Sequence, residues 1–151
     1  GGNLGGKPPV GYISIRLFAH ATEDIEKVLT AARNLVSQEH ADSVQFKRTR
    51  LRGHHGNPIT ILEAKIRDPE VIQGLLDKLA SELSPRDKRY LRRKIGLHVD
   101  GSNLYLRLDK QAAFLGEIRF SNVDAIRLSL HFKRNWTKRI EEACEKLGII
   151  T

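Results

Sequence analysis

The chain has 151 residues, of which 40% are hydrophobic and 29% charged. This length suits one domain with its own core, and no apolar run approaches the roughly 20 residues that cross a bilayer or has the form of a signal peptide. The lone cysteine, Cys144, excludes an internal disulfide and any metal site with two or more thiolates. We therefore expect an intracellular, cytoplasmic protein without membrane contact, metal or cofactor.

Basic residues outnumber acidic ones, 26 to 18, which gives a formal charge of +8. A basic surface favours polyanionic partners such as nucleic acids. The alternative is a charge-rich surface that contributes to thermal stability and binds nothing.

The first eleven residues are rich in Gly and Pro and have no periodicity, so residues 1–11 are predicted to be a flexible tail before a single domain at 12–151. Apolar and polar residues then alternate from Tyr12 to Ala19, as in a half-buried strand. His20 to Asp24 offers a hydroxyl N-cap at Thr22 and two acids, and an apolar stripe from Ile25 to Val36 predicts a helix.

The middle of the chain predicts a hairpin followed by two helices. Strands at Val44–Leu51 and Ile59–Ile66 flank a Gly- and His-rich turn. Asp68-Pro69 and Ser84-Pro85 each place an N-cap residue before a proline, which is typical of a helix start. The first of these helices runs to Leu83, and the second, densely basic, to about Lys94.

Shorter elements complete the domain. We expect a hairpin of Leu97–Val99 with Leu104–Leu108, a short helix capped by Asp109 and ended by Gly116, strands at Glu117–Phe120 and Ala125–Lys133, and a helix at Thr137–Leu147. The pattern predicts an α+β fold: one domain with a mostly antiparallel mixed sheet and amphipathic helices packed on one face.

Residues two apart on a strand share a face, so the alternation separates an apolar face from a wet, basic one. Aromatic rings that stack on bases and guanidinium groups that take phosphates are what single-stranded RNA requires. The candidate RNA-binding residues on this face are Arg16, Tyr105, Arg107, Arg119, Arg127 and Lys133, accompanied by Tyr12. The alternative is that these arginines pair across strands with Glu63, Glu117 and Asp124.

Three further features of the sequence are basic. The hairpin adds Arg50, Arg52, His54 and His55 as candidate RNA contacts, and Lys110 stands at a helix N-terminus where an anion could bind. For the basic segment Pro85–Lys94, a solvated helix face is the favoured interpretation. Cys144 shares a helical spacing with apolar residues and is expected in the core.

Catalytic motifs are scarce in this sequence. There is no Gly-flanked Ser nucleophile and no His-Glu-x-x-His, and the acids stand at helix starts and turns where capping explains them. A ribonuclease with His54 or His55 as general base and Lys110 as charge stabiliser is a weaker hypothesis than non-catalytic binding.

Three short motifs occur together: Phe18-Ala19-His20-Ala21-Thr22-Glu23-Asp24, Gly53-His54-His55-Gly56-Asn57-Pro58, and Leu104 to Ala113 with Gly116. In this order they resemble the archaeal RNA-binding proteins described as predicted exosome subunits, from about Tyr12 to the C-terminus. The resemblance implies a fold like that of the ribosomal protein that contacts five-S rRNA, and a role in RNA processing or decay with exosome subunits as partners. A protein-interaction module of a larger RNA-processing complex is the alternative function.

Overall fold

Six strands form one antiparallel sheet in the computed structural model, which describes residues 7–53 and 56–151. The strand order is β2-β3-β1-β6-β5-β4, so the N-terminal strand β1 lies at the centre of the sheet and pairs with β3 on one side and β6 on the other. The bounds are β1 Val10–His20, β2 Lys47–Arg52, β3 Pro58–Ile66, β4 Val99–Asp100, β5 Asn103–Asp109 and β6 Ala125–Phe132. The predicted α+β class is confirmed.

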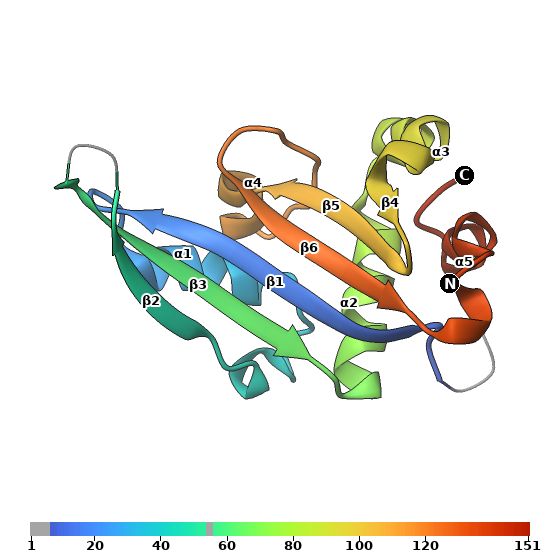
Figure 1. Ribbon diagram of the computed structural model, residues 1–151, viewed down its shortest axis with the longest axis horizontal. Coiled ribbons are helices and arrows are strands. Elements are labelled where there is room, and N and C mark those ends of the chain that lie inside the picture. Colours follow the sequence, from blue (N-terminus) through green and yellow to red (C-terminus); the bar gives the residue numbers. More distant parts are fainter. Residues whose placement is uncertain (1–6, 54–55) are drawn as a thin grey trace.

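Helices cover one face of this sheet and leave the other uncovered. The bounds are α1 Ile25–Arg33, α2 Pro69–Glu82, α3 Pro85–His98, α4 Lys110–Phe114 and α5 Ile140–Leu147. In Figure 1, α1 and α2 lie behind the strands, while α3 and α5 stand at the end of the sheet beside β4. None of the helices in the described part of the chain is both long enough and apolar enough to cross a bilayer.

The core lies between the sheet and α1 and α2. Ile13, Ile15 and Leu17 on β1 are at most 1% exposed, as the alternation predicts. Alternation also assigns to the apolar face residues of the other strands, and these are buried except Phe120, which is half-buried: Leu62, Ala64, Ile66, Leu104, Leu106, Leu108, Ile118, Phe120, Ile126, Leu128 and Leu130. The face opposite the helices therefore carries the polar residues of the central strands.

The helix starts follow the predicted capping chemistry in two places and depart from it in two. The side chains of Asp68 and Ser84 accept hydrogen bonds from backbone N–H groups of α2 and α3, with Pro in the first helical position. The predicted hydroxyl cap at Thr22 is wrong, because the Asp24 carboxylate accepts from the N–H of Glu26 at 2.9 Å. The side chain of Asp109 makes no capping hydrogen bond.

Several predicted boundaries are also wrong. β1 begins at Val10, inside the predicted tail, and β2 begins only at Lys47. Residues 117–120 form no strand, since only Phe120 makes an isolated bridge, to Leu108. At the helices, α1 ends at Arg33, α3 continues to His98 and α5 begins at Ile140. The longer α3 moves Leu97 from a predicted strand to a helix surface, where it is 80% exposed.

The one cysteine lies inside the core, as predicted. Cys144 is fully buried, and burial, with a smaller contribution from Glu141, raises the pKa of its thiol to about 12. Because the thiolate is the reactive species, we expect the native protein at pH 8 to resist a chromogenic disulfide reagent and the unfolded protein to react fully. Rapid stoichiometric labelling of the native protein would contradict this placement.

Candidate nucleic-acid interface

Three arginines stand directly opposite one another across the central strands. Arg16 on β1 is opposite Arg127 on β6, and Arg127 is opposite Arg107 on β5. Residues paired in this way point to the same face of the sheet with Cα atoms about 5 Å apart. The three side chains, here called the arginine row, are exposed on the face that no helix covers.

The arginine row is not neutralised. Within residues 7–53 and 56–151, none of its three guanidinium groups forms an ion pair with a carboxylate. Two of them lie near the ring of Phe18, with the guanidinium carbons of Arg16 and Arg127 at 5.6 and 5.9 Å from its centroid. Like charges placed opposite one another destabilise a sheet by roughly 0.2–1 kcal/mol for each pair. An anion above the row would relieve that repulsion.

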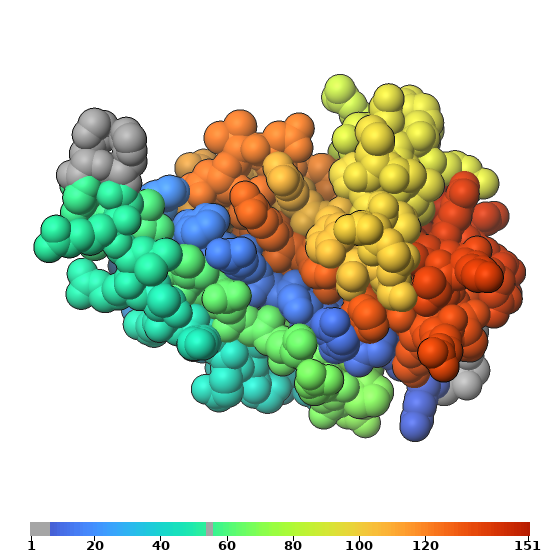
Figure 2. All heavy atoms as spheres, viewed as in Figure 1, coloured from blue at the N-terminus to red at the C-terminus, as the bar shows by residue number. Residues whose placement is uncertain are grey.

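The arginine row lies in a shallow groove of about 850 Å³ on the uncovered face, here called the sheet groove. Side chains of β1, β3, β5 and β6 are visible at this surface in Figure 2, bordered by α3. Lys47, Lys65 and Tyr105 also line the groove, together with the single carboxylate Glu63. The groove is therefore strongly basic, with five cationic side chains against one acid.

One aromatic ring in the sheet groove is available for stacking. Tyr105 is 45% exposed and lies beside Arg107 on the neighbouring strand position of the same face. Tyr12 points to the same side but already stacks on His131, at 4.4 Å between centroids, and receives Lys65 Nζ at 4.3 Å. Tyr105 is thus the better candidate for contact with a base.

The predicted hairpin arginines are not part of this face. Lys47 is opposite Glu63, which is opposite Arg16, so alternation turns Arg50 and Arg52 to the helix-covered side of the sheet. Arg48 shows the same orientation, because it pairs with Glu26 of α1 at 3.2 Å. Arg50 and Arg52 are exposed at the edge strand, and His54 and His55 lie outside the described residues.

Two other candidates lie away from the arginine row. Arg119 is exposed but pairs with Glu117 at 2.9 Å, in the segment that follows α4. Lys133 is half-buried and directly follows β6. Its backbone N–H donates to the carbonyl of Pro9, just before the start of β1. Lys133 lines neither the sheet groove nor the cleft described below.

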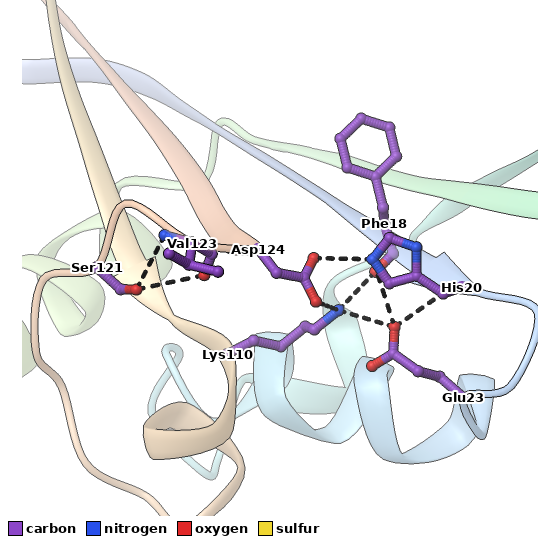
Figure 3. A network of polar contacts seen from close by, with 7 residues as sticks. All are labelled: Phe18, His20, Glu23, Lys110, Ser121, Val123 and Asp124. Atoms are coloured by element: carbon purple, nitrogen blue, oxygen red, sulfur yellow. Dashed lines mark hydrogen bonds and ion pairs between the residues drawn. The ribbon is translucent and has the colours of Figure 1, made fainter. Parts of the chain in front are cut away.

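Lys110 is buried within a polar network (Figure 3). Its Nζ lies 2.8 Å from an Asp124 carboxylate oxygen and 3.0 Å from one of Glu23, and donates to the carbonyl of Phe18 at 2.9 Å. His20 Nε2 lies 3.1 Å from the other oxygen of Asp124. We therefore leave Lys110 out of the proposed interface: its ammonium group is fully occupied.

The same network explains two features of Asp124. Burial by itself would raise the pKa of its carboxyl, but hydrogen bonds from Lys110 and His20, with their charges, outweigh burial and lower that pKa. Asp124 also adopts a positive φ of 44°, which the contacts to Lys110 and His20 hold in place. His20, Glu23 and Asp124 could together ligate a metal ion, but Lys110 already supplies a cation between them.

The interface also includes residues that the sequence analysis did not select. Lys47 is one of them. It reaches the groove because it pairs with Glu63, and this register is fixed by the length of the turn between β2 and β3. Phe18 is another, since its position near both guanidinium groups follows only from the β1–β6 pairing. No local signal in the sequence identifies either role.

The fold and the site define this protein as an α+β domain with one helical layer and one uncovered, basic sheet face. A family model described as RNA binding matches residues 12–132, and the chain belongs to this RNA-binding family. A relative from Pyrococcus abyssi, named as an RNA-binding protein, is 39% identical over 120 residues, which are 78% of each chain. An uncharacterized protein from Methanocaldococcus jannaschii is 29% identical over 140 residues, 89% of this chain and 93% of the relative.

Solved structures share the fold. A DUF54 protein from Methanothermobacter thermautotrophicus superposes with a TM-score of 0.74 at 28% identity, covering 94% of this chain and 98% of its own. A DUF54 protein from Archaeglobus fulgidus gives a TM-score of 0.76 at 25% identity, covering 91% and 99%. The architecture is therefore common to several archaeal proteins of similar length.

Proposed function

We propose that this protein binds single-stranded RNA without cleaving it, with phosphates held over the arginine row. The observation that carries the proposal is the row itself: three exposed guanidinium groups in direct register, with no carboxylate partner in the described chain, on the face without helices. Membership of an RNA-binding family supports RNA as the polyanion.

The chemistry of the groove suits backbone recognition. Each guanidinium presents a planar fork of donors that matches two phosphate oxygens, and Lys47 and Lys65 add point charges at the side. The ring of Tyr105 offers a face on which any base can stack. Contacts of these kinds give affinity with little sequence preference.

The sheet groove is poorly equipped for catalysis. Its lining residues include no histidine and only one carboxylate, Glu63, so they offer no pair of groups for general acid and general base work. The buried Lys110 is not available to stabilise a transition state either. These features support a binding protein over a ribonuclease.

A salt titration with an unstructured RNA of about 20 nucleotides tests the proposal. The three phosphate contacts of the arginine row predict that log K falls with log salt with a slope of about −2 or steeper, because single strands contribute about −0.7 per neutralised phosphate. The RNA should remain intact after incubation with and without Mg²⁺. Absence of direct binding at low salt would overturn the proposal, and metal-dependent cleavage that disappears in His54→Ala would favour the ribonuclease.

A protein-interaction role is the second candidate function, and one surface feature favours it. Phe114, Leu115 and Val123 are 42%, 72% and 79% exposed, and all three line a hollow of about 740 Å³ beside α4. Exposed apolar residues gathered in this way mark protein contacts. The resemblance to predicted exosome subunits makes purified archaeal exosome the partner to test, in a nuclease-treated co-sedimentation that Leu115→Asp should abolish.

A further inference from the structure

A second groove lies where α3 meets the edge of the sheet. It has a volume of about 1040 Å³ and is bounded by α3, by β5 and by the segment 117–122, and we call it the α3 cleft. In Figure 1, α3 stands beside the β4–β5 end of the sheet. The cleft is therefore adjacent to the sheet groove and separate from the core.

One side of α3 lines this cleft with cations. Arg86, Arg89 and Arg93 recur at the spacing of a single helix face, and all three are exposed. In the described part of the chain, none of them pairs with a carboxylate, whereas Arg92 on another side of the helix lies 3.7 Å from Glu145. Three acids also line the cleft: Glu117 pairs with Arg119, Asp87 accepts a hydrogen bond from the backbone N–H of Phe120, and the exposed Glu82 forms no ion pair within the described residues.

The cleft also has a fixed apolar and aromatic wall. The ring of His98 is held in place by two contacts. Its Nδ1 donates a hydrogen bond to the carbonyl of Tyr105 at 2.9 Å, and it packs edge to face against the ring of Tyr90. Tyr90 in turn lies 6.1 Å from Phe120. Leu97, which is 80% exposed, also lines the cleft and adds an apolar surface to this wall.

The two grooves share residues. Tyr105 and Arg107 line both the sheet groove and the α3 cleft, so a strand that leaves the arginine row passes directly into the cleft. The distance from Lys47 to Arg107 across the sheet is only roughly 19 Å, at about 4.8 Å for each strand. A longer ligand must therefore continue beyond the edge of the sheet.

We infer that the RNA strand continues from the arginine row over Tyr105 and Arg107 into the α3 cleft, where Arg89 and Arg93 bind further phosphates. This inference rests on the proposed function. It assigns RNA binding to the basic face of α3, which the sequence analysis interpreted as a solvated helix face. It makes the protein selective for single strands long enough to fill both grooves. The occupant is a single strand, because bases stacked on Tyr105 and against Leu97 must be unpaired.

Binding of two oligouridylates, of about 5 and about 14 nucleotides, tests the inference. The double variant Arg89→Ala/Arg93→Ala should bind the longer oligonucleotide with about tenfold lower affinity and the shorter one with unchanged affinity. The matched control, Arg92→Ala/Lys94→Ala, removes the same charge from another side of the same helix and should change neither affinity by more than about twofold. Leu97→Glu places a good helix former at an exposed position of α3, so the fold should be kept. This variant should also lower the affinity for the longer oligonucleotide only.

The outcomes separate this inference from the function on which it rests. If the parent protein binds both oligonucleotides and the α3 variants bind the longer one with parental affinity, the α3 path is wrong and the arginine row stands. If the parent binds neither, the proposed function itself fails. Equal weakening by the control double variant would show that only net charge matters, which also overturns the cleft as a specific path.

Discussion

Replacing Arg16, Arg107 and Arg127 together by alanine is expected to reduce RNA affinity about 100-fold at moderate salt. Each exposed guanidinium–phosphate contact contributes about 1 kcal/mol, and about 1.4 kcal/mol corresponds to a factor of ten in affinity. The slope of log K against log salt should become shallower by about 2, since three phosphates lose their partners. Fluorescence anisotropy over a salt series measures both quantities.

Two control variants make this experiment specific. The triple variant of Arg92, Arg134 and Arg139 removes the same formal charge from exposed residues that line neither groove, and it should keep most of the affinity. Replacing the arginine row by lysine keeps the charge and the salt slope but removes the planar fork, so affinity should fall by less than in the alanine variant. An alanine variant with parental affinity and slope would remove the sheet face from consideration.

The alanine substitutions should change the free energy of unfolding little, because the relief of repulsion between the three cations offsets the lost contacts of Arg16 and Arg127 with Phe18. Urea unfolding of the free protein checks this point. A large loss of stability would show that the arginines hold the sheet together through contacts other than those described, and the loss of RNA affinity would then have to be corrected for unfolded protein.

The second large effect is expected at Lys110, where substitution by methionine should destabilise the fold by about 3 kcal/mol. The Nζ of this 8% exposed side chain contacts Glu23, Asp124 and the carbonyl of Phe18, and removal leaves two neighbouring carboxylates without their cation. For a chain of this length the melting temperature should fall by about 10 °C. Lys27→Met, at an exposed lysine near the same network, is the matched control and should have little effect.

The pH dependence follows from the lowered pKa of Asp124. A carboxyl whose pKa is lower in the folded than in the unfolded protein stabilises the fold at pH values above the unfolded pKa, near 3.8. That stabilisation is lost as the pH falls through the lower folded pKa. The difference in unfolding free energy between the parent and Asp124→Asn should therefore be constant near pH 7 and shrink below pH 3.8, as urea titrations would show. Asn is chosen because it tolerates the positive φ at this position.

The Lys110 result also bears on function. If the network is structural, folded Lys110→Met protein should bind RNA with parental affinity at a temperature well below its melting point. A specific loss of RNA affinity in that folded variant would return Lys110 to the interface, against its burial in the structure.

The helix and strand pattern was largely readable from the sequence, for a physical reason. Alternation on β1 and the N-cap–Pro pairs before α2 and α3 are local signals, because burial on a strand has a period of two and caps act within one turn. The errors fell where local signals compete. Asp24 took the cap predicted for Thr22, and residues 117–120 lacked a neighbouring strand with which to pair.

The sequence by itself determined that the central strands have one apolar and one basic face, and that Arg16, Arg107 and Arg127 belong to the basic one. Only the tertiary structure decided that these three lie in one row, that Arg50 and Arg52 turn to the other side, and that Lys110 is buried between carboxylates from distant segments. The physical reason is that the face of a side chain depends on local alternation, whereas its neighbours depend on strand register and on chain packing, which no short stretch of sequence encodes.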